Sequence, residues 1–442
     1  MSALSTIRSR LRRGLWQDPD FLRLWSAQTI STFGSLTAGL VLSFLAINTL
    51  DASPFQLSLL GMCGLVPAFV AGPFVGVLVD RTRRRPVMIL TDISRAIVVG
   101  AVPVAALTDT LGMNLLYVLA ALMSVLSLSF DVANRAHLPW LVSRTQLTEA
   151  NSRLTGAGSV VEAAAFASAG GLVRLLTAPF VFVITSLTFL WSAWIVSRIR
   201  KPEPRPHDHD ARLPVTTEIA SGFRYVATTG LLRAVLASAF VFNLFTSMLG
   251  TLYVLYILRE IGFSEAISGV SFALGGAAAL GGAVFAGRIT RRLGVGYAMV
   301  AALVVIAVAN LLVPLSTEAS LLAFALILTQ QFFGDSAWTV YEIAETSLVQ
   351  AGAPDQWQGR VQSILRMTQF GGQLLGTLGA GLLPFVLSVR ETMIVASVGI
   401  ALATVPILVS SVRRLRDIPV IDDEAEMEEI AHAAAEYELP VR

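Results

Sequence analysis

Acidic side chains inside long apolar stretches are the residues of this sequence best able to do chemistry. Glu162 lies near the middle of the apolar stretch 150–176, and Asp335 lies within the stretch 319–345. If these stretches cross a membrane, a carboxylate at the helix centre costs about 2.5 to 3.5 kcal/mol to insert, so it is expected to be paired or to face water. Because apolar surroundings favour the neutral form of a carboxylic acid, Glu162 and Asp335 could each carry a proton. Alternatively, Glu162 pairs with Arg366 and only holds helices together.

A second set of charges surrounds a short connector between two apolar stretches, which end at Val79 and resume at Val87. The set comprises Asp80, Arg81, Arg84, Arg85, Asp92, Arg95, Asp131 and Arg135. Several arginines in a short loop indicate the cytoplasmic side of a membrane. We expect the set to form a charge cluster at an inner gate. Arginines that only fix the topology would explain the basic residues equally well, but not Asp80.

The elements that position these residues follow from the composition. The chain has 442 residues, of which 55% are hydrophobic and 14% charged, and its mean hydropathy is +0.70. A water-soluble domain carries more charge than this, so the sequence predicts a membrane protein. A spanning helix takes roughly 20 apolar residues, and on that measure the apolar stretches predict about twelve helices.

Two halves of the chain repeat. Asp131-Val-Ala corresponds to Glu342-Ile-Ala after a shift of 211 positions (342 − 131), which favours an internal duplication. We therefore expect an all-α membrane protein with about twelve transmembrane helices in two pseudo-symmetric six-helix bundles. The expected regions are a cytoplasmic tail at 1–20, a first bundle at 21–199, a linker with an amphipathic helix at 200–229, a second bundle at 230–412 and an acidic cytoplasmic tail at 413–442.

Basic residues fall almost entirely in connectors on one side of the predicted helices. Only Arg174, Arg259 and Arg390 fall at the other face. By the positive-inside rule, both termini are expected in the cytoplasm.

Polar side chains share one face of several predicted helices, as expected for helices that line a central cavity. The first helix offers Gln28 and Thr32, and the seventh offers Asn243. The tenth helix carries Gln331, Asp335, Trp338 and Glu342. We expect the acids among them to carry charge inside the cavity.

The connector also carries a sequence signature. Gly76, Asp80, Arg81, Arg84 and Arg85 follow the order of a glycine, three residues, an acid, a base, a spacer and further bases. In these residues the chain resembles the major facilitator superfamily, with Arg83 where a second glycine often stands. The resemblance implies two six-helix bundles around a binding cavity. It also implies that Asp80 caps the eleventh helix and contacts Asp131 in the outward-facing state.

Further residues resemble one branch of that superfamily. The stretch from Asp131 through His137 to Asn151, and Gly359-Arg-Val361, are similar to macrolide-efflux and enterobactin-exporter proteins of the drug:proton antiporter type. The Gly-Pro pair of the antiporter signature is absent from the fifth helix, where 164–171 takes its place.

Enzymatic chemistry has little support in the sequence. Lys201 is the only lysine, so no phosphate-binding loop ending in Lys-Ser or Lys-Thr exists. The histidines lack metal-ligand spacing on a helix, and no Gly-x-Ser-x-Gly nucleophile turn occurs. We expect a protein that is not an enzyme and has no metal, no cofactor and no nucleic-acid partner.

The sequence thus predicts a secondary active transporter in a bacterial inner membrane, acting as a monomer. It would export a hydrophobic or amphipathic small molecule, such as a drug, a macrolide or a siderophore-like compound, by alternating access coupled to protons. Two alternatives stay open. One is uncoupled or differently coupled transport of a nutrient or lysophospholipid. The other is a non-transporting membrane scaffold or sensor, which the lack of a sizeable soluble domain disfavours.

Overall fold

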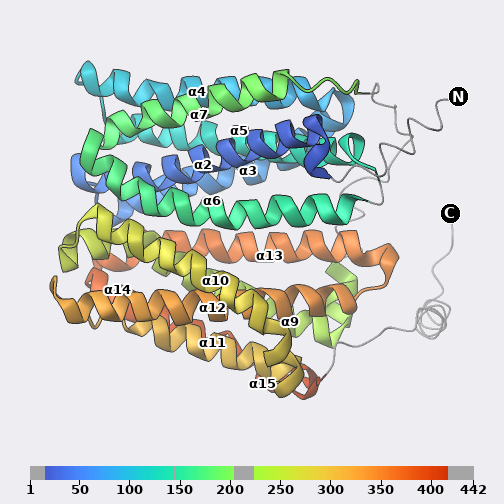
Figure 1. Ribbon diagram of the computed structural model, residues 1–442. Helices are drawn as coiled ribbons and strands as arrows, with labels where there is room; N and C mark the ends of the chain where they lie inside the picture. Colours follow the sequence, from blue (N-terminus) through green and yellow to red (C-terminus); the bar gives the residue numbers. More distant parts are fainter. Residues whose placement is uncertain (1–14, 144–145, 204–222, 417–442) are drawn as a thin grey trace, which may run out of the picture.

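The computed structural model describes residues 15–143, 146–203 and 223–416, and helices account for nearly all of them. The first half of the chain forms α2 (Pro19–Phe44), α3 (Pro54–Arg81), α4 (Arg84–Leu107), α5 (Met113–Leu141), α6 (Leu147–Leu176) and α7 (Ala178–Ser197). The second half forms α9 (Gly230–Leu255), α10 (Glu265–Leu293), α11 (Val295–Leu311), α12 (Leu321–Ala351), α13 (Asp355–Leu382), α14 (Val389–Leu402) and α15 (Thr404–Val409). The two sets occupy the upper and lower halves of Figure 1.

Several helices begin where a nearby side chain supplies the hydrogen bonds that a first turn lacks. Ser53 and Gln56 form a reciprocal capping box at the start of α3. At the start of α2, the carboxylate of Asp18 accepts a hydrogen bond of 2.9 Å from the backbone N–H of Asp20. The predicted linker lies largely outside the described residues, but 223–228 at its end is helical, as expected for a short amphipathic helix.

Nine segments of the described residues are long and apolar enough to cross a membrane. Of the other long helices, α11 has only 17 residues, while α12 and α13 carry polar side chains such as Gln331, Asp335 and Arg366. Length and apolarity alone therefore support fewer crossings than the roughly twelve predicted from the sequence. Helices that line a polar interior need an apolar surface on one side only.

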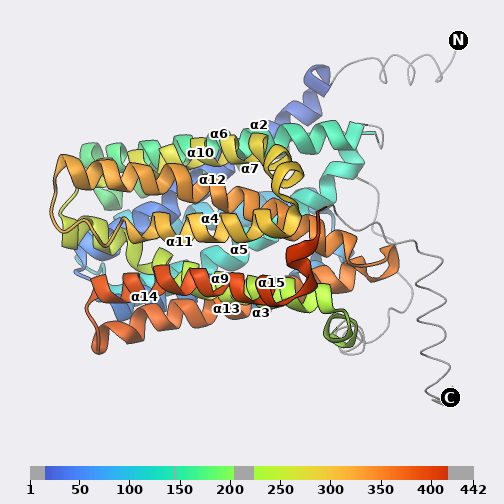
Figure 2. The same cartoon turned by 90° about the horizontal axis from the view of Figure 1, so that it is seen from below.

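Helix packing repeats between the two halves. In the first half, α2 packs on α6 and α7, α3 on α5, and α4 on α5 and α7. The corresponding helices of the second half form the same pairs: α9 packs on α13 and α14, α10 on α12, and α11 on α12 and α14. The halves meet along two equivalent pairs, α6 with α10 and α3 with α13, the latter visible in Figure 2. Equivalent pairs are what an internal duplication predicts.

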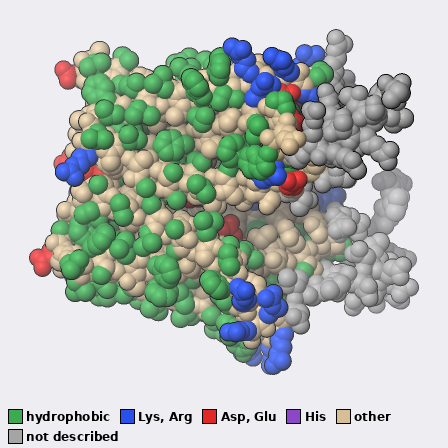
Figure 3. Space-filling view, in the orientation of Figure 1, with side chains coloured by type: hydrophobic (Ala, Val, Ile, Leu, Met, Phe, Trp, Pro, Cys, Tyr) green, Lys and Arg blue, Asp and Glu red, His purple; other side chains and the backbone are tan. Residues whose placement is uncertain are grey.

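Charged side chains separate toward the two ends of the molecule. We call one end the basic end, because the following arginines lie there at helix termini: Arg81, Arg84, Arg198, Arg291, Arg292 and Arg414. The other end, which holds Asp51 and Arg259, is the distal end. Basic side chains gather at the first of these ends in Figure 3, and the surface is hollowed between the two bundles toward it.

Glycines let the bundles approach each other backbone to backbone near the distal end. A Cβ at Gly170 of α6 would lie 2.1 Å from the carbonyl oxygen of Glu265 in α10. A Cβ at Gly269 of α10 would lie 2.5 Å from the carbonyl oxygen of Phe166 in α6. Small residues at crossings of this kind allow membrane helices to pack closely.

A similar approach within the second bundle gives a test of the packing. A Cβ at Gly376 of α13 would lie 1.9 Å from the carbonyl oxygen of Leu244 in α9, whereas one at Gly371 would meet only a ring atom of Phe240 at 3.6 Å. Gly376→Ala is expected to destabilise the protein by about 1 to 3 kcal/mol, because α9 and α13 must separate. Thermal unfolding of the purified protein in detergent would show a lower Tm. Gly371→Ala on the same helix is the control, and equal Tm values for the two variants would contradict this packing.

Candidate functional site

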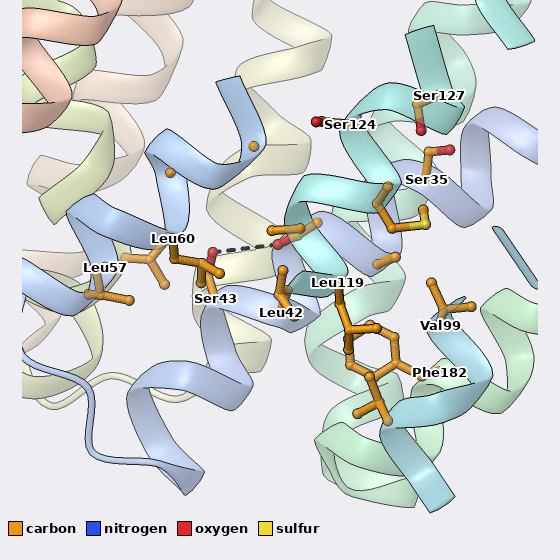
Figure 4. A pocket seen from close by; sticks show the side chains of 18 of the residues that line it. Ser35, Leu42, Ser43, Leu57, Leu60, Val99, Leu119, Ser124, Ser127 and Phe182 are labelled. Atoms are coloured by element: carbon orange, nitrogen blue, oxygen red, sulfur yellow. Dashed lines mark hydrogen bonds between the residues drawn. The ribbon is translucent and has the colours of Figure 1, made fainter. Parts of the chain in front are cut away.

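An apolar cavity of about 380 Å³ lies within the first bundle and against α9 of the second (Figure 4). Its walls are mostly hydrocarbon side chains, with a few hydroxyl groups: Leu42, Leu57, Leu60, Val99, Leu119 and Phe182, together with Ser35, Ser43, Ser124, Ser127 and Thr251. Among the described residues no charged side chain lines it. A cavity of this size and chemistry can hold the apolar part of a small molecule.

A second cavity, of about 210 Å³, lies within the second bundle, and its walls include amide and carboxylate side chains. Its walls include Gln330, Gln331, Asp335 and Trp338, all from α12. Gly250 of α9 lines both cavities, so the two meet at that helix. The structure thus brings three of the residues predicted on the tenth helix, Gln331, Asp335 and Trp338, to one wall, whereas Glu342 is not part of the lining.

A hydrogen-bonded chain fixes part of that wall. The hydroxyl of Tyr253 donates to Oε1 of Gln330 at 2.8 Å, and Nε2 of Gln330 donates to Oδ1 of Asn310 at 3.3 Å. Beside it, Nε2 of Gln331 is buried and has no hydrogen-bond partner among the described residues. A buried amide without a partner is costly, so Gln331 is available to donate to a bound molecule.

The three predicted acids of the cavity come together across the interface between the bundles. Glu162 of α6 interacts electrostatically with Glu342 and with Asp335 of α12. Asp335 lines the second cavity, where its Oδ2 lies only 2.0 Å from the place a Cβ would take on Gly275. Within the described residues no ion pair joins Glu162 to Arg366, whose side chain is exposed. This conformation therefore lacks the Glu162–Arg366 pair, which was the alternative to a proton-carrying role for Glu162.

Asp92 and Arg95 lie inside the first bundle, away from the surface between the two bundles. Their side chains are 0% and 2% exposed and form an ion pair. Ser31 of α2 donates to Asp92 at 3.2 Å and accepts from Arg95 at 3.0 Å. The guanidinium of Arg95 also lies over the ring of Phe130, 4.4 Å from its centroid. This pair holds α2, α4 and α5 together.

Asp131 and Arg135 of α5 are both exposed. Asp131 interacts electrostatically with Arg95 and Arg135. It is thus the exposed member of a charge network whose other acid, Asp92, is fully buried.

The residues of the signature connector differ in their surroundings. Arg84 and Arg85 bind within the first half of the chain: the carboxylate of Glu203 accepts from their backbone N–H groups at 2.7 and 3.2 Å, and Nε of Arg85 donates to the carbonyl of Val196 at 3.2 Å. Arg81 is exposed. A Cβ at Gly76 would meet nothing within 4 Å.

The contact that the resemblance implies for Asp80 falls on a side chain outside the described residues, so it stays a prediction. Asp80 lies in the last turn of α3, and its side chain lies outside the described part of the chain. The N-cap residue of α13 is Pro354, whose own side chain forms no capping hydrogen bond.

The remaining predicted residues connect helices. Gln28 of α2 accepts from Asn134 of α5 at 2.8 Å, and Asn243 of α9 accepts from Gln373 of α13 at 3.1 Å. Thr32 is half-buried on α2. The first contact joins α2 to α5 and the second joins α9 to α13, which are not equivalent pairs of helices. The two halves therefore resemble each other in helix packing more than in side-chain contacts.

Sequence reasoning missed a set of bonds that close the distal end. Arg259 forms an ion pair of 2.6 Å with Asp51 and donates to the carbonyl of Ala52 at 2.9 Å. Asn48 donates to Glu265 at 2.5 Å. We call Asn48, Asp51, Arg259 and Glu265 the distal latch. The one available signal was Arg259 itself, an arginine on the face where arginines are rare.

All the hydrogen bonds and ion pairs that can be assigned between described residues of the two bundles lie at the distal end. Besides the latch, the hydroxyl of Ser58 in α3 donates to the carbonyl of Thr377 in α13 at 2.5 Å.

A second residue that the predicted site did not include is Glu345 of α12. It is 3% exposed and accepts from Tyr341 and Gln369 at 3.1 and 3.0 Å.

Comparison with known proteins agrees with this architecture. A profile of the family described as the Major Facilitator Superfamily matches residues 24–377. The chain is 27% identical over 377 residues to the uncharacterized MFS-type transporter YfiS of Bacillus subtilis, covering 82% of this chain and 86% of that protein. It is 25% identical over 364 residues to the multidrug efflux pump Tap of Mycolicibacterium fortuitum, covering 78% and 85%. It is also 28% identical to macrolide efflux protein A of Streptococcus pyogenes, over 29% of this chain and 32% of that protein.

Solved structures show the same fold. A bacterial homologue of the human lysosomal transporter Spinster, in an inward-facing and unoccupied conformation, matches with a TM-score of 0.68 at 16% identity, over 89% of this chain and 97% of that one. The superfamily resemblance of the signature connector is thereby confirmed. The chain belongs to the Major Facilitator Superfamily, a family of multi-pass membrane transporters and not of enzymes.

Proposed function

We propose that this transporter exports a hydrophobic or amphipathic small molecule bearing a positive charge, by alternating access coupled to protons. The observation that carries the proposal is an apolar cavity that shares Gly250 with a second cavity lined by amides and a carboxylate, beside three acids that have no described basic partner. Apolar walls suit the body of such a molecule, and the acids suit its charged group. The efflux functions of the macrolide and multidrug relatives support export.

The basic end is the cytoplasmic end in this proposal. Positive charge is retained on the cytoplasmic side of membranes, so both termini would lie in the cytoplasm and the membrane would be the bacterial cytoplasmic membrane. The conformation, latched at the distal end and hollowed toward the basic end, would then face inward. The protein would work as a monomer, since one chain supplies both bundles and both cavities.

Repulsion among the acids supplies a simple route to coupling. Glu162 interacts electrostatically with Glu342 and with the half-buried carboxylate of Asp335, and like charges at such a site repel each other. A proton on one of them would relieve the repulsion, and so would a cationic substrate bound beside them. Once either positive charge has relieved the repulsion, the site binds the other more weakly, so proton and substrate would occupy the site in turn. This exchange is what antiport requires.

The gate would use the opposite end of the molecule. When the basic end closes, Asp80 would approach the amino end of α13, where the helix dipole places partial positive charge, and would face Asp131. Arg81 is exposed near this junction, while Arg84 and Arg85 anchor the connector to the first bundle.

Removing charge from the acids should abolish coupling. Inverted vesicles containing the protein are loaded with acid, and a pH dye reports proton release while cationic dyes, macrolides, tetracyclines and siderophores are added singly. We expect at least one cationic amphipathic compound to trigger release, and Asp335→Asn or Glu162→Gln to slow it at least tenfold. Glu318→Gln, at an exposed distal site, should leave the rate unchanged. Transport without proton release would instead support the uncoupled alternative.

Asp80→Asn tests the gate. The variant should reach the membrane in normal amount but transport at least tenfold more slowly, because an amide stabilises the amino end of α13 less than a carboxylate does. Asp109→Asn is the control. It makes the same change in a distal turn, where the backbone φ of 53° suits asparagine as well as aspartate. Full transport by the Asp80 variant would exclude the gate role.

Arg259→Ala tests the distal latch. Asp51 is 94% exposed, so that ion pair alone contributes little, but hydrogen bonds from a charged group to carbonyls contribute about 1.5 to 3 kcal/mol. Losing them should shift the population toward a distal-open state by about tenfold or more. Spin labels at Asp109→Cys and Glu318→Cys, with Cys63→Ser, would report longer distances. Arg174→Ala is the matched control, and an unchanged distance distribution in the Arg259 variant would contradict the latch.

A further inference from the structure

A basic pocket of about 480 Å³ lies at the basic end of the first bundle, apart from both central cavities. It forms between the start of α4 and residues 198–203, which follow α7. Its walls combine cations with aliphatic side chains: Arg83, Arg85, Arg200 and Lys201 with Ile89, Leu90 and Ile93. Glu203 is the acidic residue of the lining.

Some of these charges are already engaged. Glu203 accepts from the backbone N–H groups of Arg84 and Arg85 at the start of α4. Arg85 donates to the carbonyls of Val196 and Ser197 at the end of α7, and Nζ of Lys201 donates to a carbonyl of α5 at 2.8 Å. These bonds build the pocket.

Two guanidinium groups remain available in the pocket. The side chains of Arg83 and Arg200 are exposed, and neither has an assigned hydrogen-bond or ion-pair partner among the described residues. The backbone N–H of Arg200 is held by Asp20 at 3.1 Å, which fixes the position of its Cα. Guanidinium groups bind phosphate oxygens in a planar, paired geometry.

The apolar wall of the pocket continues into the surface that faces the bilayer. Leu90 and Ile93 are 66% and 38% exposed, and the same face of α4 continues through Ile97, Val104 and Leu107, all of them exposed. α4 is one of the segments long and apolar enough to span a membrane. It lies along the outer edge of the first bundle beside α7 (Figure 1). Cations at the end of a lipid-facing apolar stripe match the division of a phospholipid into headgroup and acyl chain.

We propose that this pocket binds an anionic phospholipid, with its phosphate between Arg83 and Arg200 and one acyl chain along Leu90, Ile93 and Ile97. Basic pockets at the cytoplasmic ends of membrane helices recognise anionic headgroups in this way. The stripe on α4 favours a bilayer lipid over a soluble phosphate, which has nothing to place against these side chains. The proposal is independent of the transported substrate and of the coupling ion.

The test measures lipid binding directly. Purified protein in detergent is titrated with phosphatidylglycerol, cardiolipin or phosphatidylcholine, and native mass spectrometry counts bound lipids. We expect the anionic lipids to bind at least tenfold more tightly than phosphatidylcholine. The double variant Arg83→Gln/Arg200→Gln should lose that preference, while Arg291→Gln/Arg292→Gln, which removes the same charge from the second bundle at the same end, should keep it. Equal losses in both variants, or no preference in the unmodified protein, would overturn the site.

Two further measurements guard against a misfolded variant and against a free anion. A photoreactive phosphatidylglycerol added to the unmodified protein should label residues within 83–97, and labelling confined to other helices would refute the placement. Glycerophosphoglycerol, the headgroup without acyl chains, should compete at least a hundredfold less well than the lipid. Equal competition would mean that the pocket binds soluble phosphates and would overturn the lipid assignment.

Discussion

The two bundles touch backbone to backbone where α6 crosses α10, and the rest of the arrangement depends on that contact. Gly170 and Gly269 have no side chain to hold the helices apart, so a carbonyl of each helix rests on a glycine of the other. The latch around Arg259 and the α3–α13 pair then close the same end. Two rigid bundles that meet closely at one end diverge toward the other, which is where the surface is hollowed.

Charge inside the molecule is distributed between two kinds of environment. Asp92 is paired with Arg95, and Glu345 accepts two hydrogen bonds, so these buried acids hold helices together. Glu162 and Asp335 have no such partners among the described residues and interact with one another across the bundle interface. A buried charge that is fully paired is suited to structure, whereas a carboxylate without a partner at the interface between the bundles is suited to a changing occupant.

The helices, the two halves and the superfamily could be predicted from the sequence, because apolar length, the repeat and the connector signature are properties of local residues. The meeting of Glu162 with α12 was not predicted, since the partner considered for Glu162 from the sequence was Arg366. Partners across the fold could not be predicted: Arg259 binds carbonyls, which have no sequence signature. Arg84 and Arg85 were assigned to the gate with Asp80, yet their described contacts are within the first half of the chain. Asp92 was placed in the gate cluster because it lies near the end of a helix, yet its side chain is buried inside the bundle.

The two cavities that meet at Gly250 differ in character although the helices around them pack in equivalent pairs. The first half of the chain supplies hydrocarbon walls, and the second supplies amides and a carboxylate. A molecule with an apolar body and a charged head would therefore be bound in a single orientation, with its head toward the carboxyl-terminal half. An exchange of the two walls between the halves would reverse that orientation while leaving the helix packing unchanged, so polarity of binding can evolve separately from the architecture that moves the bundles.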